Sequence, residues 1–259
     1  MPELPEVEFF RSIIEKCLFL EICGFEVRDE QFFITPVRDY GRILVGNEFV
    51  GVGRRGKFLV VDLRLYSLKL VFHFGMTGDL SYSKTGELEE KHVRVVFRFV
   101  NGYELRVIDQ RRFGKLYLVE DMVQVKTIRN MGGEPLEMDE KNFLDVCNRH
   151  PRRTVKSFLM DQSVIAGIGN IYSDEILFQA GVRPNRKIGD LTEAEKRGIF
   201  RKMREVLEKM VRADANFWGF KDFLLPYREG GAKCPKCGGA LETLKIANRT
   251  SYYCPRCQS

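Results

Sequence analysis

Apolar side chains near the start of the chain recur at the spacing of a helix. Over residues 3–20 they alternate with charged positions, and the apolar set is Leu4, Val7, Phe10, Ile13, Ile14, Cys17 and Leu18. This period places them on one face of a helix, which then has a surface to bury. Pro5 suits a first helical turn, where the missing N–H breaks no intrahelical bond. The pattern therefore predicts an N-terminal amphipathic helix.

Between about residues 22 and 120 the pattern changes to short runs that favour β-structure. These runs are residues 24–28, 48–54, 57–63, 67–74, 93–100, 103–108 and 115–119. Turn signals such as Asn101-Gly102 separate them. Several short strands at this spacing predict an antiparallel sandwich or barrel.

Helical spacing returns after residues 132–135, whose sequence Gly-Gly-Glu-Pro is typical of a linker. The helical runs are residues 139–149, 154–160, 168–179 and 192–213. Thr192 followed by Glu195 indicates a capping box at the start of the last run. The predicted fold class is thus multidomain α+β, with an N-terminal β-sandwich led by an α-helix and a C-terminal helical domain. We place the domains at residues 1–131, 132–228 and 229–259.

Four of the seven cysteines form two Cys-x-x-Cys pairs near the end of the chain, at Cys234, Cys237, Cys254 and Cys257. Each such turn presents two sulfurs to one ion, and four thiolates complete the tetrahedral shell of Zn²⁺. Residues 232–259 are too few to form a core of their own, so a metal must hold them together. We predict one structural Zn²⁺ with no open coordination position.

The charge balance adds little to this picture. Lysine and arginine total 42 against 36 acidic residues, a net charge of +6, which agrees with a polyanionic partner without requiring one. No apolar run approaches the roughly 20 residues that a bilayer span needs. The acidic, proline-bearing start is unlike a signal peptide. We therefore expect a cytoplasmic protein with no membrane partner.

The first residues also carry candidate chemistry. Removal of Met1 would make Pro2 a secondary amine at a helix start. The positive end of the helix disfavours a further positive charge and so lowers the pKa of that amine, which for an α-amine is ordinarily about 8. A neutral amine can attack carbon and form a Schiff base, and Glu3 and Glu6 are candidate proton carriers beside it. The alternative is a proline-bearing helix start with no chemistry.

Three loop motifs point to nucleic acid. Gly53–Lys57 places three cations on a glycine-kinked turn that could clamp a phosphate, unless it is only a solvated basic turn. Phe72–Gly78 and Asp109–Gly114 each place an apolar side chain on a tight loop after a strand. Such side chains wedge into duplexes from which a base has been extruded, although each could also be a core residue at a turn.

Together these features resemble the formamidopyrimidine-DNA glycosylase / endonuclease VIII family, and the formamidopyrimidine-DNA glycosylase branch more closely. The resemblance covers essentially the whole chain. The matching stretches, in the order of the family, are Pro2–Glu8, His73–Gly78, Arg111–Gly114, Gly167–Tyr172 and the terminal cysteine pairs. The resemblance implies a helix–two-turn–helix in the helical domain, a zinc finger after it, and DNA in the cleft between the domains.

The resemblance also implies an activity. A member of this family is a bifunctional DNA glycosylase and AP lyase of base excision repair, which acts through a Schiff base and β,δ-elimination. The expected substrates are oxidised purines in double-stranded DNA (formamidopyrimidines, with 8-oxoguanine left open) and abasic sites, and the expected state is a monomer. Two alternatives stay open. One is an endonuclease VIII-like glycosylase for oxidised pyrimidines, and the other is a non-catalytic damaged-DNA-binding protein.

Residue roles follow from the matching positions. Pro2 is expected to attack the sugar C1′ and Glu3 to transfer protons. Lys57 is expected to contact the phosphate of the lesion, and Arg249 to serve the second elimination. The trio expected to fill the vacated space and engage the orphan base is Met76, Arg111 and Phe113. The residues expected to contact the DNA backbone are His92, Arg152, Lys156 and Asn170.

Two positions depart from the family pattern. Guanine-lesion enzymes of the family have a long loop that closes over 8-oxoguanine, whereas here only ten residues separate Phe223 from Cys234. We therefore expect formamidopyrimidines and hydantoins to be excised faster than 8-oxoguanine, with Phe217, Trp218 or Phe220 stacking in place of the lid. The other departure is Arg94, near the position of a family histidine, for which the sequence offers no interpretation.

Overall fold

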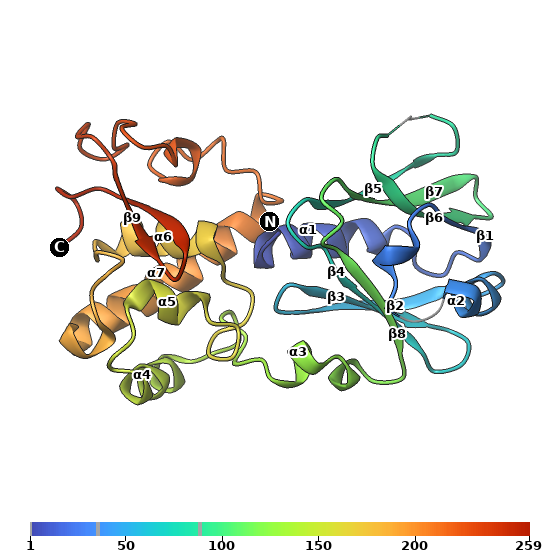
Figure 1. Ribbon diagram of the computed structural model, residues 1–259, viewed down its shortest axis with the longest axis horizontal. Coiled ribbons are helices and arrows are strands. Elements are labelled where there is room, and N and C mark those ends of the chain that lie inside the picture. Colours follow the sequence, from blue (N-terminus) through green and yellow to red (C-terminus); the bar gives the residue numbers. More distant parts are fainter. Residues whose placement is uncertain (1, 35–36, 88–89) are drawn as a thin grey trace. The chain divides into compact units, whose positions relative to one another are not determined.

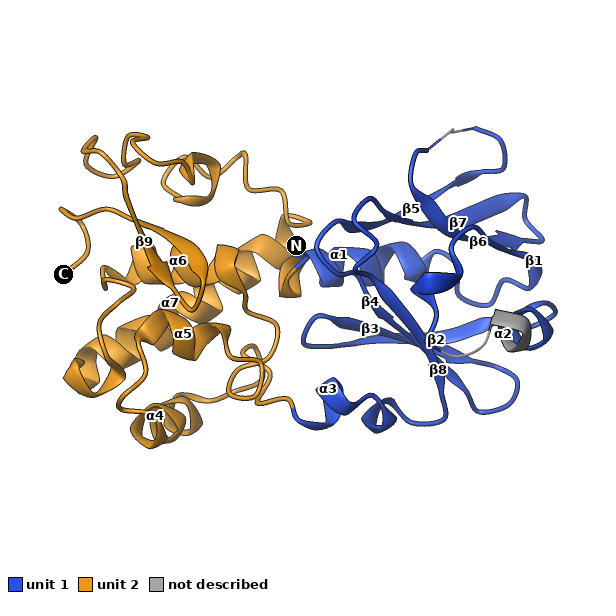
Figure 2. Cartoon of the chain, viewed as in Figure 1, with its two compact units in different colours: residues 1–2, 6–130 blue, residues 3–5, 131–259 orange. Residues whose placement is uncertain are grey.

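The computed structural model describes residues 2–34, 37–87 and 90–259 (Figure 1). The chain forms two compact units (Figure 2). Unit 1 contains Glu6–Asn130 and the first two positions, and unit 2 contains Glu3–Pro5 and Met131–Ser259. Helix α1 (Leu4–Glu15) thus begins with residues of unit 2 and continues in unit 1.

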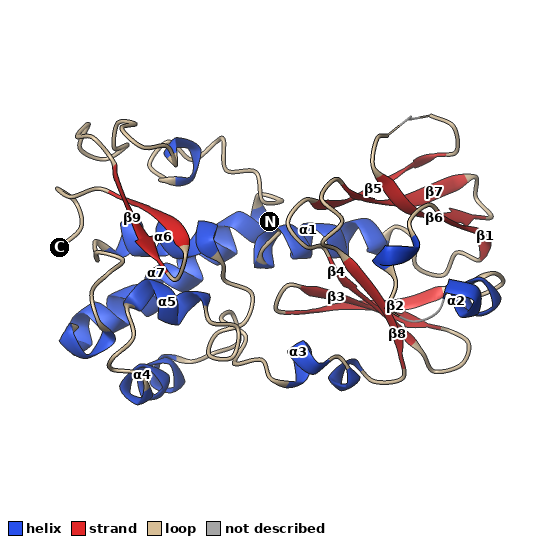
Figure 3. Ribbon diagram, in the orientation of Figure 1, coloured by secondary structure: helices blue, strands red, loops and turns tan. Residues whose placement is uncertain are grey.

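Unit 1 contains two four-stranded antiparallel sheets, drawn as red strands in Figure 3. The first sheet has the order β1 (Ile22–Val27), β6 (Val93–Phe99), β7 (Tyr103–Asp109) and β5 (Gly78–Lys84). The second has the order β2 (Phe49–Arg55), β3 (Phe58–Leu63), β4 (Lys69–His73) and β8 (Lys115–Val119). The segments η1 (Glu30–Phe32) and α2 (Val37–Leu44) lie between β1 and β2 and so connect the two sheets. The segments η2 (Met122–Gln124) and α3 (Lys126–Arg129) follow β8, after the last strand of unit 1.

One core joins the two sheets and helix α1. Leu59 of the second sheet and Phe97 of the first are fully buried in the same cluster, together with Val7 of α1. Successive strand side chains point to opposite faces, so the alternate apolar positions of each strand supply this core. The predicted sandwich led by a helix is therefore confirmed.

One strand of the sandwich, β5, was absent from the sequence prediction. Its only large apolar residue that is buried in the core is Leu80, and most of its other side chains are polar. The strand nevertheless pairs with β7 over its full length, from Gly78↔Asp109 to Lys84↔Tyr103. Pairing with a neighbour, which a local hydrophobic pattern does not reveal, makes this segment a strand.

Unit 2 is helical and ends in a β-hairpin. Its helices are α4 (Glu140–Arg149), α5 (Val155–Met160), α6 (Asn170–Ala180) and α7 (Glu193–Arg212), with the short turns η3 (Ile188–Asp190) and η4 (Leu225–Tyr227). The hairpin strands are β9 (Glu242–Ile246) and β10 (Arg249–Tyr253). The predicted capping box is confirmed, because Thr192 and Glu195 exchange both bonds at the start of α7.

Helix α6 is the centre of unit 2. Every residue from Tyr172 to Phe178 is buried, polar ones included. Leu4 belongs to the same apolar cluster as Tyr172 and Ile176, and its N–H donates to the carbonyl of Gly167 at 3.0 Å. The first turn of α1 is therefore part of the folding core of unit 2.

The stretch that the sequence suggested as a linker is bonded into unit 2. The N–H of Gly132 donates to Gln162 at 2.9 Å, and the carbonyl of Gly133 accepts from Ala166 at 2.9 Å. A Cβ at Gly132 would lie 2.1 Å from the carbonyl oxygen of Val164, so only glycine fits there. The helical domain and its hairpin otherwise follow the predicted fold class, which is confirmed. Among the described residues, no helix combines the length and apolarity that a membrane crossing requires.

His73, at the end of β4, is a half-buried histidine whose surroundings disfavour its charged form. Its Nδ1 accepts from the N–H of Gly75 at 3.4 Å, and its ring centroid lies 4.7 Å from that of Phe58. Burial, reinforced by the positive charge of Lys57, lowers the pKa of His73 to about 4. The ring is therefore neutral at physiological pH, with Nδ1 as the acceptor.

We predict that the free energy of unfolding falls as the pH is lowered from about 6.5 toward 4, partly because of His73. Since its folded-state pKa lies below the unfolded value, the unfolded state takes up the proton first, and the stability present above pH 6.5 is lost. One proton changes the free energy by at most about 1.4 kcal/mol per pH unit. His73→Asn keeps an acceptor for Gly75 but cannot titrate. The free energy of unfolding, measured with urea at several pH values, should therefore fall less steeply with decreasing pH in this variant. An equal dependence of the free energy of unfolding on pH in both proteins would contradict the lowered pKa of His73.

Candidate active site and zinc centre

The carboxylate of Glu3 occupies the N-terminus of helix α6. It accepts hydrogen bonds from the backbone N–H groups of Gly169 at 2.6 Å, Ile171 at 2.9 Å and Tyr172 at 3.2 Å. The N-cap residue, Gly169, has no side chain to do this. A negative charge is favoured at the positive end of a helix, and these groups otherwise have no intrahelical partner. The buried side chain of Glu3 is therefore held in one place.

Pro2 lies one residue ahead of this fixed carboxylate. It is half-buried and lies two residues before the start of helix α1. The bonds of Glu3 and of the Leu4 N–H immobilise the backbone that follows it. Met1, whose removal the chemistry of Pro2 requires, lies outside the described residues. The position of Pro2 at the positive end of α1 is the one that the sequence predicted.

The basic turn of unit 1 uses one of its cations for structure. Arg54 donates from Nε to Glu8 at 2.7 Å and from Nη1 to the carbonyl of Gly56 at 3.0 Å. It therefore shapes the turn, in which Gly56 adopts a φ of 55°. Lys57, which follows, is largely buried, and its charge acts on His73. Arg54 is thus committed to the fold of the turn, and phosphate contact by the other two cations of the turn stays a prediction.

Asp109 joins two loops that follow strands. Its Oδ1 accepts from the hydroxyl of Thr77 at 2.6 Å, and its Oδ2 accepts from the N–H of Gly114 at 2.7 Å. At Gly75, with a φ of 59°, a Cβ would come within 2.5 Å of the carbonyl carbon of Phe113. The loop after β4 and the loop after β7 are therefore packed directly on each other.

This packing brings the predicted wedge trio together. Met76 is 43% exposed and Phe113 is 51% exposed, although both are large apolar residues. The guanidinium of Arg111 lies 5.1 Å from the centroid of the Phe113 ring. Exposed apolar side chains on loops held by a buried carboxylate are suited to contact with a partner rather than to a core.

Arg94, which the sequence left unexplained, supports the same loop. It is buried, and its Nε donates to the carbonyl of Asp109 at 2.8 Å, while its Nη1 lies 3.5 Å from the carboxylate of Asp29. His92 is exposed with a φ of 65°, and its carbonyl accepts from the N–H of Asp109 at 3.0 Å. The sequence singled out His92 as a candidate residue. It did not reveal that Asp109 holds the two loops together or that Arg94 supports Asp109.

The predicted backbone contacts in unit 2 differ in accessibility. Arg152 is exposed in the loop before α5, and Asn170 is half-buried at the first position of α6. Lys156 is fully buried, with its Nζ 2.5 Å from Asp174 Oδ1. Burial lowers the pKa of Lys156, and the charge of Asp174 opposes that effect. With no exposed surface, Lys156 is not placed for the direct phosphate contact that the sequence suggested.

The four terminal cysteines form a structural zinc site. Their sulfurs all lie within 4.8 Å of one another, with Cys234 and Cys257 at 3.8 Å and Cys237 and Cys254 at 3.5 Å. Four sulfurs at the Zn–S distance of about 2.3 Å in a tetrahedron stand about 3.8 Å apart. The donor set therefore fits Zn²⁺, as predicted. Arg249 is exposed at the start of β10, directly after the tight turn of this hairpin.

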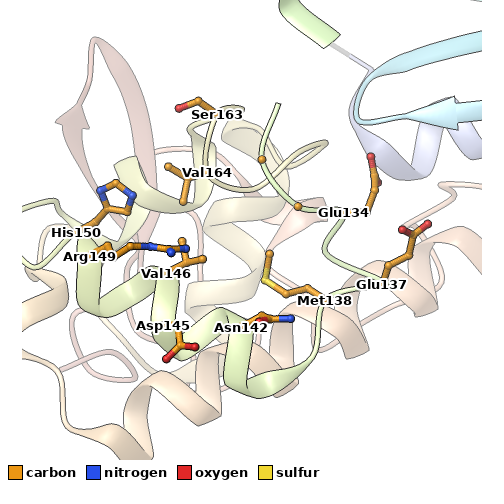
Figure 4. Close-up of a pocket in the computed structure, with 12 residues that line it drawn as sticks. Glu134, Glu137, Met138, Asn142, Asp145, Val146, Arg149, His150, Ser163 and Val164 are labelled. Carbon is orange, nitrogen blue, oxygen red and sulfur yellow. The ribbon is translucent and has the colours of Figure 1, made fainter. Parts of the chain in front are cut away.

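A pocket of about 490 Å³ lies elsewhere in unit 2 (Figure 4). Figure 4 shows Arg149 and His150, from the end of α4, on one side and Glu134 and Glu137 on the other. None of the predicted catalytic residues is among the described residues that line it. The residues predicted to carry the chemistry therefore lie outside this cavity.

Comparison with known families covers nearly the whole chain. Residues 1–116 match the formamidopyrimidine-DNA glycosylase N-terminal domain, and residues 131–222 match the H2TH domain of the same glycosylase. Residues 231–259 match a zinc finger found in FPG and IleRS.

Full-length relatives give the same result. Formamidopyrimidine-DNA glycosylases of Desulforamulus reducens and Pelotomaculum thermopropionicum are 36% and 34% identical to the chain, covering all of it and 99% of their own length. A crystal structure of a Lactococcus lactis FPG mutant with Fapy-dG containing DNA is similar, with a TM-score of 0.89, 27% identity and complete coverage of both chains. The complex of the Lactococcus lactis Fpg with abasic-site DNA has a TM-score of 0.88, 27% identity and 99% coverage of each.

We predict that Cys254→Ser removes the zinc and abolishes nucleic-acid binding while unit 1 stays folded. The reason is that the hairpin has too small a core to fold without its metal. Elemental analysis should find about one zinc per chain in the wild type and little in the variant. Cys23→Ser, at an exposed cysteine on β1, is the matched control and should keep its zinc. Full zinc content in Cys254→Ser would contradict the assignment.

Proposed function

The chain belongs to the formamidopyrimidine-DNA glycosylase family, and on that basis we propose that it is a bifunctional DNA glycosylase and AP lyase of base excision repair. The observation that carries the mechanism is the carboxylate of Glu3, fixed on three N–H groups of α6 one residue after Pro2. The solved relatives hold DNA with a Fapy-dG lesion or an abasic site. We assign such double-stranded DNA to this chain as its substrate.

The first step uses the amine of Pro2. Its neutral nitrogen donates an electron pair to the sugar C1′, the glycosidic bond breaks, and the base leaves with a proton. Opening of the sugar ring then gives an iminium between the proline nitrogen and C1′. Glu3 acts as the proton carrier, and its negative charge stabilises the iminium cation. Holding the carboxylate beside the amine in advance avoids reorganisation during the reaction.

The elimination steps are assigned to Lys57 and Arg249. Lys57 follows the tight turn at Gly56 and contacts the phosphate of the lesion, which becomes a leaving group in the eliminations. Arg249, exposed on the zinc hairpin, serves the second elimination. Loss of both phosphates leaves a gap with phosphate ends.

Binding of DNA is assigned to loops of both units. Met76, Arg111 and Phe113 fill the space that the extruded base leaves, because their two loops are held rigidly by Asp109. His92, Arg152 and Asn170 contact the DNA backbone. Lys156 is retained as a residue that positions others from the interior.

The division of labour follows the domains predicted from the sequence. Residues 1–131 carry Pro2, Glu3 and Lys57, residues 132–228 the helix–two-turn–helix, and residues 229–259 the zinc finger with Arg249. We assign the protein as a monomer that acts in the cytoplasm.

The segment before the zinc finger favours lesions other than 8-oxoguanine. It is too short for a long lid, and of its aromatic residues Phe220 stacks on Phe223 at 4.8 Å while Phe217 packs against the core. Trp218, at 74% exposure, is the aromatic side chain of this segment that presents its ring to solvent. An exposed indole ring can stack on the face of a flipped base without forming hydrogen bonds to the edge of that base.

We predict that single-turnover excision is faster for formamidopyrimidines and hydantoins than for 8-oxoguanine in otherwise identical duplexes. The reason is that stacking on Trp218 tolerates non-planar or ring-opened bases, whereas 8-oxoguanine depends on edge recognition by a lid. Glu3→Gln is the matched control, since it should bind the same duplexes and excise poorly.

Three outcomes would contradict this proposal in different ways. Faster excision of 8-oxoguanine opposite cytosine would refute the lesion preference. Excision confined to oxidised pyrimidines would favour the endonuclease VIII-like activity, and binding without any strand cleavage would identify a non-catalytic damage-binding protein.

A further inference from the structure

The N-terminus of α6 has little capacity left for a phosphate. A helix start ordinarily offers its N–H groups to an anion. Here the N–H groups of Gly169, Ile171 and Tyr172 already donate to Glu3. Lys156, the nearby cation that the sequence singled out, is buried against Asp174. A phosphodiester at Asn170 therefore needs a positive charge from another residue.

Arg228 is the cation beside Asn170. It follows the short turn η4, and its Nη2 donates to the backbone carbonyl of Asn170 at 3.2 Å. The same Nη2 donates to Asp174 Oδ2 at 2.8 Å. Its side chain remains 16% exposed, unlike that of Lys156. No sequence motif pointed to this residue.

The hydrogen-bonding capacity of this pair is not filled within the protein. Among the described residues, Nε of Arg228 is a buried donor that has no hydrogen-bond partner. Oδ1 of Asn170 has no partner among them either, but it is an acceptor, so only the amide nitrogen of Asn170 can donate to a phosphate. Buried polar atoms in folded proteins are nearly always bonded to protein, water or ligand. The hydrogen bonds of Arg228 to Asn170 and to Asp174 both start from Nη2. A guanidinium has five N–H donors, so Arg228 retains others for a ligand rich in acceptors, such as a phosphate.

Asp174 and Tyr252 hold Arg228 in this orientation. The carboxylate of Asp174 also accepts from Ser251 Oγ at 2.7 Å and from the N–H of Tyr252 at 3.2 Å, both on the zinc hairpin. The guanidinium carbon of Arg228 lies 5.0 Å from the centroid of the Tyr252 ring. A carboxylate at one edge and a ring over the face hold the planar guanidinium in one orientation.

Charge at this helix start is balanced within the protein, because the cations Lys156 and Arg228 face the carboxylates of Asp174 and Glu3. Of the two cations, Arg228 is the one with exposed surface. An anion that approaches from solvent therefore meets Arg228 rather than Lys156.

We propose that Arg228 is a DNA-backbone residue that binds, together with the side chain of Asn170, one phosphodiester of the substrate strand. Asp174 is its positioning residue, and through Ser251 it links this contact to the hairpin that carries Arg249. The inference rests on the proposed function, because the phosphodiester belongs to the DNA substrate. A phosphate contact adds affinity without reading sequence or lesion.

The test is the salt dependence of DNA binding by the full-length zinc protein. The probe is a duplex with a tetrahydrofuran abasic analogue, alongside the undamaged duplex. Arg228→Gln should reduce the slope of log K against log salt by about one, as expected for one lost phosphate contact, and weaken binding of both duplexes by a similar factor. Arg228→Lys keeps the charge and should retain most of the slope.

Arg212→Gln is the matched control. Arg212 lies at the end of α7, is 80% exposed and pairs only loosely with Glu208 at 3.7 Å, so its removal should leave the slope unchanged. Zinc content should be equal in all variants, and excision at saturating enzyme should change less than binding. A wild-type slope in Arg228→Gln would overturn the proposal, as would a loss in Arg228→Lys equal to that in Arg228→Gln. Absence of excision by the wild type would refute the proposed function instead. The dependence of DNA affinity on salt would still show whether Arg228 contacts a phosphate.

Discussion

The bond between the carboxylate of Glu3 and the first N–H groups of α6 is the constraint on which the rest of this structure depends. It satisfies a helix start that has no side-chain cap, and it removes a charged group from water without leaving it unpaired. Because Glu3 is the third residue of the chain, the same bond determines where Pro2 can be. It also uses donors that a helix start would otherwise offer to DNA, so the phosphate contacts shift to side chains such as Arg228.

Buried carboxylates organise the exposed residues in both units. In unit 1, Asp109 ties the loop of Met76 to the loop of Phe113 and is itself supported by Arg94. In unit 2, Asp174 joins α5, α6 and the zinc hairpin. Each carboxylate is fully bonded, and such networks favour a single arrangement of the loops around them. Functional side chains can then be exposed and still be precisely placed.

Features that depend on local chemistry could be predicted from the sequence, and features that depend on distant partners could not. The capping box at Thr192 and the zinc ligands require residues that are close in sequence or have a specific spacing. The burial of Lys156 depends on Asp174, eighteen positions later. Arg228 is placed by residues of α6, and Arg94 by the carbonyl of Asp109. A residue type that suits DNA contact also suits a buried ion pair, and only the tertiary structure distinguishes the two.

The central claim is that the amine of Pro2, placed by the neighbouring Glu3, is the nucleophile. The most direct measurement is peptide mapping by mass spectrometry after sodium borohydride has reduced the enzyme–DNA imine to a stable amine. We predict that the sugar remnant is attached to the nitrogen of Pro2 in protein from which Met1 has been removed. An ordinary lysine, with a pKa near about 10.4, is almost wholly protonated at neutral pH and competes poorly. Attachment at Lys57, or trapping by protein that retains Met1, would contradict the account.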